Sequence, residues 1–167
     1  MNTIKIIDNF FEEDLSKYLD KYFLEIPHLY GHSSLDLKSH KEQIPFYTSY
    51  LNIHDPLIKF LCLKVQKQVD YKIGFYRTYI NIHFNGMPGT WHPDEGDTTF
   101  LVMTSKTLQK GSGQFQVKIN NDDNNIKSID FIQNRLIIFP ATWEHRGLDP
   151  VEHATPRVTL AFKTSKI

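Results

Sequence analysis

The hydrophobic period of the chain changes near Phe75, and this change limits the folds that the sequence can adopt. Before it, apolar residues recur at helical spacing; after it, apolar and polar residues alternate in short runs separated by glycine and asparagine clusters. A helical first third followed by many short strands predicts an α+β chain that is mostly β. Many short strands favour a sandwich or a barrel, and a jelly roll is the version that closes over an internal cavity. Of these we expect a jelly-roll core (a double-stranded β-helix) with the N-terminal helices packed on one sheet.

Two helices are expected in the first third. Residues 12–23 have apolar side chains at helical spacing behind an acidic start, which suits the positive end of a helix dipole. A second helix is expected from Asp55 as N-cap, with Pro56 in the first turn, to about Val69. Its inner face is expected to hold Leu57, Phe60, Leu61 and Val65.

Six strands are expected after the helices. The last of them places small and polar residues beside one arginine on one face and apolar residues on the other, as a strand lining a polar cavity would; an exposed edge strand would look similar. The expected strands cover residues 76–84, 98–104, 114–119, 128–132, 136–139 and 158–163. The two faces of the last strand hold Arg157, Thr159, Ala161 and Lys163, and Val158, Leu160 and Phe162.

The segment from Glu25 to His54 shows no clear period and contains four of the chain's histidines. Long connections of this kind are usually functional or poorly ordered. A lid over an active site and a loosely structured surface segment are both compatible with the sequence.

Length and composition narrow the class of protein. The 167 residues suit a single domain over 1–167, divided into a helical support (1–74) and a jelly-roll core (75–163). Lys+Arg and Asp+Glu number 19 each, so no bulk positive charge favours a nucleic acid partner. The single cysteine, Cys62, lies in an apolar helix flank, which indicates a packed thiol in a reducing compartment.

We expect a cytoplasmic protein without a membrane anchor. The N-terminus lacks the features of a signal peptide, and no apolar run reaches the roughly 20 residues that span a bilayer. The sequence carries no signal for the oligomeric state.

Two histidines and one aspartate make up the candidate metal site. His92 and Asp94 are two residues apart, so on an extended backbone both side chains leave the same face. His145 follows an apolar strand that stops at a proline, and two imidazoles with one carboxylate are the ligand set of mononuclear non-haem iron(II). Chance alone would supply about 0.5 His-x-Asp tripeptides in such a chain, so an acidic surface turn and a solvent-facing loop histidine are the alternatives.

Arg157 opens the last expected strand and offers a permanently charged fork for a carboxylate. The chain lacks a nucleophile elbow, a phosphate-binding loop, a dinucleotide glycine fingerprint and paired zinc thiolates.

In this order the motifs resemble the iron(II)/2-oxoglutarate-dependent oxygenases, specifically their prolyl-4-hydroxylase-like branch. The resemblance covers most of residues 75–163 and matches the helical third only in general shape. Its motifs are Ile6–Phe11, the pair His92 and Asp94, Gly111–Phe115, Ile138–Pro140 with His145, and Pro156–Leu160.

The resemblance implies a dioxygenase that hydroxylates an unactivated C–H bond of a peptide or amino acid side chain, such as proline, with release of succinate and CO2. Iron(II) would be held by His92, Asp94 and His145, and Arg157 would bind the distal carboxylate of the co-substrate 2-oxoglutarate, with O2 as oxidant. The partner would be a peptide or a small molecule.

The chain departs from the family pattern at two positions. Collagen-type prolyl hydroxylases usually have lysine where this chain has Arg157, and several relatives have a tyrosine that helps bind the co-substrate near His83. Asn81 and Tyr79 lie on the same alternating face and would compensate, while His83 is expected to be a packed or surface histidine rather than a fourth ligand.

Two other functions are compatible with the sequence. An oxidative demethylase of alkylated nucleic acid would also pair Arg157 with a basic residue six positions on, here Lys163. A cupin-like, non-catalytic ligand-binding module would make the histidines incidental.

Overall fold

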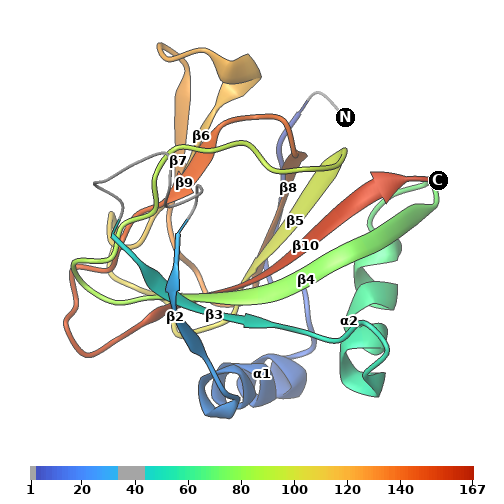
Figure 1. Cartoon of the computed structure of the whole chain (residues 1–167), viewed down its shortest axis with the longest axis horizontal. Helices are drawn as coiled ribbons and strands as arrows, with labels where there is room; N and C mark the ends of the chain where they lie inside the picture. Colours follow the sequence, from blue (N-terminus) through green and yellow to red (C-terminus); the bar gives the residue numbers. More distant parts are fainter. Residues whose placement is uncertain (1–2, 34–43) are drawn as a thin grey trace.

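The computed structural model, which describes residues 3–33 and 44–167, has two antiparallel sheets (Figure 1). Side chains from both sheets line one cavity. Together with the helices, the two sheets confirm the predicted, mostly β jelly-roll core. Within the described residues, the larger sheet has the order β1 (Lys5–Ile7), β8 (Arg135–Pro140), β5 (Thr98–Met103), β10 (Arg157–Lys166), β4 (Ile73–His83), β3 (Phe46–Tyr50) and β2 (Leu29–His32). The smaller sheet has the order β7 (Ile126–Ile129), β6 (Phe115–Lys118) and β9 (His145–Gly147), and a 3-10 turn, η1 (Ile119–Asn121), follows β6.

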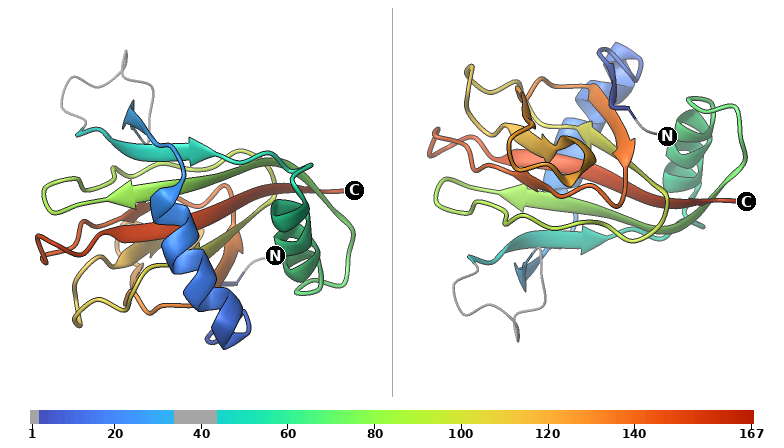
Figure 2. Two further views of the ribbon diagram at one scale, coloured as in Figure 1. Left: turned by 90° about the horizontal axis from the view of Figure 1, so that it is seen from below. Right: turned by 90° about the horizontal axis from the view of Figure 1, so that it is seen from above.

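Helices α1 (Glu13–Glu25) and α2 (Pro56–Gln66) pack on the face of the larger sheet that is turned away from the smaller one (Figures 1 and 2). The Asp55 carboxylate accepts hydrogen bonds from the backbone N–H groups of Leu57 and Ile58, at 2.9 and 3.2 Å, which confirms the predicted N-cap. The apolar layer between helices and sheet is continuous, so the helices fix the outer face of the strands that line the cavity.

The inner face of α2 differs from the prediction. Phe60 is 44% exposed, and the helix ends at Gln66 instead of Val69. Phe60 falls between the rows of side chains that reach the sheet, so its ring stays at the surface beside the Lys64 ammonium, 5.4 Å from the ring centroid. The buried side chains of α2 are those of Ile58, Leu61, Cys62 and Val65, at helical spacing.

Strand β10 lies in the middle of the larger sheet, between β4 and β5. The edge-strand alternative for this segment is therefore wrong. Its cavity face and its apolar face are those that the alternation predicted. The cavity face carries Arg157, Thr159, Ala161 and Lys163, and the apolar face carries Val158, Leu160 and Phe162.

The segment 25–54 is not the structureless connection that its sequence suggested. Its described parts form β2 and β3, which extend the larger sheet beyond β4. With β1, they add three strands to the helical support expected over 1–74. Residues 34–43, in the middle of the segment for which a lid and a surface segment were both compatible with the sequence, lie outside the described residues, while Gly31, His32 and Phe46 form part of the cavity wall.

Cys62 is buried, and burial raises the pKa of its thiol to about 11, as expected of a packed cysteine. Neither helix found in residues 3–33 and 44–167 is long and apolar enough to cross a bilayer.

Candidate metal centre

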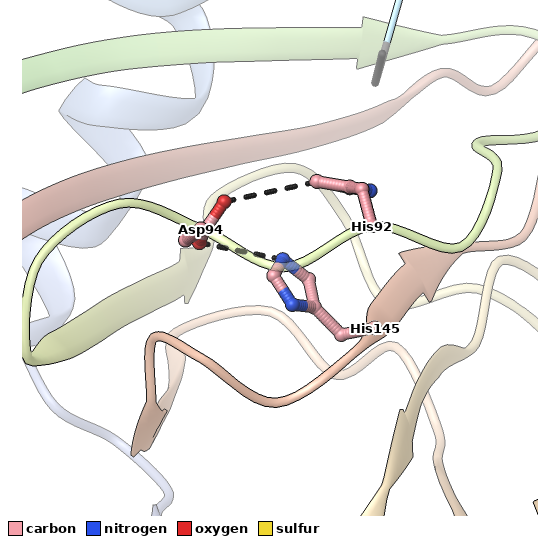
Figure 3. Close-up of side chains that lie close together, drawn as sticks. All are labelled: His92, Asp94 and His145. Atoms are coloured by element: carbon pink, nitrogen blue, oxygen red, sulfur yellow. Dashed lines mark ion pairs between the residues drawn. The ribbon is translucent and has the colours of Figure 1, made fainter. Parts of the chain in front are cut away.

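The side chains of His92, Asp94 and His145 lie close together (Figure 3), and all three line the cavity. Each offers one ligand atom, and these atoms all lie within 4.8 Å of one another. His92 and Asp94 come from the connection between β4 and β5, and His145 is the first residue of β9 in the other sheet. The three residues singled out in the sequence are therefore brought together, two from the β4–β5 connection and one from the smaller sheet.

Backbone hydrogen bonds hold this arrangement. The N–H of His92 donates to the carbonyl of His145 at 3.1 Å, and the N–H of His145 donates back at 3.0 Å. The N–H of Asp94 donates to the carbonyl of Ala141 at 2.7 Å, just beyond the proline that ends β8. Because backbone hydrogen bonds hold both His92 and Asp94, their segment cannot move away from His145. The distances between the three candidate ligands are therefore fixed by the fold.

Both imidazoles present a lone pair to the aspartate. The Nδ1 of His92 lies 2.8 Å from the carbonyl oxygen of Thr90, and the Nδ1 of His145 lies 2.9 Å from that of Trp143. A carbonyl only accepts, so each Nδ1 carries the proton and each Nε2 is free to act as a ligand. Burial lowers the pKa of His92 to about 3 and of His145 to about 4, which keeps both rings neutral.

The two oxygens of the Asp94 carboxylate have different partners. Thr99 donates a hydrogen bond to Oδ2 at 2.7 Å, and the ammonium of Lys163 forms an ion pair with the same oxygen. Oδ1 lies 3.8 Å from Nε2 of His92, and Oδ2 lies 3.3 Å from Nε2 of His145. Because the donors gather on Oδ2, Oδ1 is the oxygen left to bind a metal.

Lys163 was not predicted as part of this site, although its face of β10 was. It is 1% exposed and is the only fully buried lysine in the part of the chain that the structure describes. An ammonium that deep in a cavity requires a partner, and Asp94 supplies it.

This donor set fits a divalent transition metal. Two neutral imidazole nitrogens and one carboxylate oxygen converge from one side, and the other side opens on a cavity of about 630 Å³. Three protein ligands that leave the remaining positions open are typical of a metal that binds substrate or co-substrate.

Arg157 lines the same cavity and is 2% exposed. Its Nε donates a hydrogen bond to the carbonyl of Gly113 at 2.9 Å, and its Cζ lies 5.6 Å from the centroid of the Phe131 ring. Burial lowers the pKa of the guanidinium to about 10, so it stays charged at neutral pH. A Cβ atom on Gly147 would lie 2.7 Å from Cζ of Arg157, so a glycine is needed there to make room for the arginine.

Asn81 and Tyr79 also face the cavity, as their alternation with His83 predicted. The Oδ1 of Asn81 accepts a hydrogen bond from Thr48 at 3.1 Å, and burial raises the pKa of the Tyr79 phenol.

His83 lies directly opposite Arg157 in the β4–β10 pairing. Its ring stacks on Phe46 with the centroids 4.2 Å apart, and its Nδ1 bonds the carbonyl of Met87 at 2.7 Å. It is not part of the cluster of possible metal ligands found in residues 3–33 and 44–167. His83 is thus a packed histidine in the cavity wall.

No protein-family model matches the chain, and no curated protein matches it in sequence.

Solved structures do match the fold. A prolyl hydroxylase from Trichoplax adhaerens, in complex with a hypoxia inducible factor oxygen degradation domain peptide fragment, superposes with a TM-score of 0.72 at 18% identity over 97% of this chain and 83% of that one. A prolyl-4-hydroxylase from Pseudomonas putida gives 0.73 at 11% identity over 98% and 93%. HygX from Streptomyces hygroscopicus, with nickel and 2-oxoglutarate bound, gives 0.71 at 9% identity over 95% and 81%. The chain therefore has the fold of these proteins, prolyl hydroxylases among them.

Proposed function

We propose that the protein is an iron(II)/2-oxoglutarate-dependent dioxygenase that hydroxylates an unactivated C–H bond of a peptide or amino acid side chain, such as proline. One observation carries the proposal: His92, Asp94 and His145 converge on the cavity that also contains the buried guanidinium of Arg157. Three neutral or anionic ligands and a separate fixed cation in one cavity suit a metal and a dicarboxylate side by side. HygX, which has the same fold, binds nickel and 2-oxoglutarate, and this supports the choice of co-substrate.

The ligand residues would hold iron(II) through Nε2 of His92, Nε2 of His145 and Oδ1 of Asp94. The carbonyls that fix each Nδ1–H would keep the imidazoles oriented, and Lys163 with Thr99 would hold Oδ2 of Asp94 away from the metal. Bound iron(II) would supply the oxidation by O2, coupled to conversion of 2-oxoglutarate to succinate and CO2.

The other cavity residues would place the co-substrate. Arg157 would bind the distal carboxylate, since it is the fully buried arginine of the described chain and its partner would be shielded from water. Asn81 and Tyr79 line the wall of β4 between Arg157 and Lys163, where they would contact the carbon chain and help exclude water.

The substrate is proposed by analogy. The Trichoplax adhaerens protein was solved with a peptide, which supports a peptide substrate for a chain of the same fold. The proposal includes a cytoplasmic location, supported by a single cysteine that is buried as a thiol.

The experiment measures succinate formation by the purified protein with iron(II), 2-oxoglutarate and O2, together with the weak visible absorption of iron(II) and 2-oxoglutarate without O2. The wild type is expected to give both signals, and His92→Ala and Asp94→Ala are expected to abolish both. His153→Ala is the matched control, because His153 is exposed and lies outside the cavity.

Unchanged signals in His92→Ala and Asp94→Ala would refute the iron assignment. If instead a small ligand bound without iron and only His145→Ala reduced its affinity, a cupin-like binding module would be the better account. A screen of peptides, free amino acids and methylated oligonucleotides for faster succinate formation would then identify the substrate class.

A further inference from the structure

Among the described residues, three cationic side chains line the cavity, and the proposed function uses only two of them. Lys163 is paired with Asp94, and Arg157 is assigned to the co-substrate. The third is Arg77, on β4. Within residues 3–33 and 44–167, no carboxylate lies within ion-pair distance of Arg77, and its Nε is buried without a hydrogen-bond partner. A buried guanidinium N–H without an acceptor is costly, so this group calls for a partner.

The strand pairing makes the position of Arg77 unfavourable in the absence of an anion. Arg77 and Lys163 are direct partners in the antiparallel pairing of β4 and β10, and like charges opposite each other destabilise a sheet. Burial, then the Arg77 and Lys163 charges, lower the pKa of His32, which also lines the cavity. Arg77 and Lys163 thus place two cationic side chains side by side on this wall.

The proposed metal and co-substrate do not neutralise this charge. A divalent metal and the dianion 2-oxoglutarate cancel each other, and Lys163 cancels Asp94. Of the charged lining residues within 3–33 and 44–167, Arg157 and Arg77 remain, against the exposed carboxylate of Glu95. These described residues leave one positive charge over, which favours a substrate with a negative charge.

The geometry of Arg77 selects the kind of anion. Its Cζ lies 5.3 Å from the centroid of the Tyr79 ring, so the ring lies against the guanidinium. The buried Nε and the terminal nitrogens form a planar fork, which matches the two oxygens of a carboxylate.

We propose that Arg77 is a substrate-binding residue that receives a carboxylate of the primary substrate, so that the enzyme acts on a molecule or residue bearing a free carboxylate. This inference rests on the proposed function, because it takes the metal and 2-oxoglutarate to fill the rest of the cavity. It assigns Arg77 a role separate from Arg157: the former selects the substrate, and the latter holds the co-substrate.

The experiment measures binding by calorimetry, on protein loaded with nickel(II) and 2-oxoglutarate, so that no turnover occurs. The probes are the twenty free L-amino acids, each compared with its α-carboxamide; aspartate and glutamate are also compared with asparagine and glutamine. Inorganic phosphate is a further probe. The proteins are the wild type, Arg77→Gln, Arg77→Lys and the control Lys127→Gln, whose lysine is exposed on β7 and outside the cavity.

The wild type and Lys127→Gln are expected to bind at least one acid tenfold or more tightly than its amide. Arg77→Gln is expected to lose this preference while binding nickel and 2-oxoglutarate as before, and Arg77→Lys to keep part of it. An acid preference that survives in Arg77→Gln, no preference for any acid in the wild type, or tight binding of phosphate alone would overturn the proposal. Failure of the wild type to bind nickel and 2-oxoglutarate together would instead overturn the proposed function, and this inference with it.

Discussion

The two faces of β10 have different roles: one contributes to the stability of the fold, and the other lines the candidate site. Its apolar face packs against the helix layer, where Leu160 and Phe162 are fully buried in the larger apolar cluster. Its cavity face carries Arg157 and Lys163, which are equally buried but charged.

Burial therefore has opposite effects on the free energy of folding on the two faces. On the apolar face it removes hydrocarbon from water and stabilises the fold. On the cavity face it removes charges from water, at a cost that only ion pairs and ligands offset. Substitutions on the first face should change folding and those on the second should change binding.

The largest effect is expected on the apolar face. Phe162→Ala should lower the free energy of unfolding by about 3–5 kcal/mol, since it leaves a cavity beside Phe75, whose ring centroid lies 6.0 Å away. Urea unfolding of the metal-free protein measures this. Thr159→Ala on the cavity face is the matched control, with an expected loss of about 1 kcal/mol. Equal losses in the two variants would remove the distinction between the faces.

On the cavity face, Arg157→Gln should weaken 2-oxoglutarate binding by roughly a hundredfold, because it removes a shielded, charge-assisted contact. The free energy of unfolding of the ligand-free protein should change by less than about 1 kcal/mol, since the loss of the hydrogen bond to Gly113 is balanced by relief of a buried charge. Calorimetry with manganese(II) present gives the affinity. Unchanged affinity would show that another residue binds the co-substrate.

Gly147→Ala tests whether Arg157 needs the space beside β9. The added Cβ would lie 2.8 Å from both terminal nitrogens of Arg157, so the guanidinium must move. We expect 2-oxoglutarate affinity to fall roughly 10- to 50-fold, and metal affinity to stay unchanged. The control compares Arg157→Gln with the double variant Arg157→Gln/Gly147→Ala in the same titration. Without the arginine, the added alanine should cause no further loss of 2-oxoglutarate affinity. An additional loss would mean that Gly147 acts independently of Arg157.

The smallest effect, taken per pH unit, is on the pH dependence of stability and concerns His83, opposite Arg157. Burial lowers the pKa of His83 from 6.5 to about 3, so as the pH falls below about 6.5 the unfolded chain binds a proton that the folded chain does not. Stability should therefore fall between pH 6.5 and 4, and His83→Gln should reduce this dependence by about 1 kcal/mol per pH unit. Urea unfolding at several pH values measures the slope; an unchanged slope would mean that His83 is charged in the folded protein.

Much of the fold followed from local patterns. The two helices, the Asp55 cap and the two faces of β10 were predicted because each depends on residues close in sequence. Strands β2 and β3 were missed, since short strands such as these are defined by the strands they pair with, β3 with β4 and β2 with β3, more than by their own residues.

In the candidate site, too, some features follow from the local sequence and others depend on long-range contacts. His92, Asp94 and His145 could be selected by residue type and spacing, and the structure places them together. The partners of Lys163 and Arg77 could not be predicted, because the alternation gives a face of the sheet but not the register that sets Lys163 opposite Arg77 and beside Asp94.

The central claim is that these three residues bind one metal ion, and titration of manganese(II) into the metal-free protein tests it most directly. We predict one equivalent bound by the wild type and by the control Asp123→Ala, whose aspartate is exposed at the surface. Asp94→Ala and His145→Ala should each reduce the affinity at least a hundredfold. One equivalent bound with wild-type affinity by both of these variants would contradict the account.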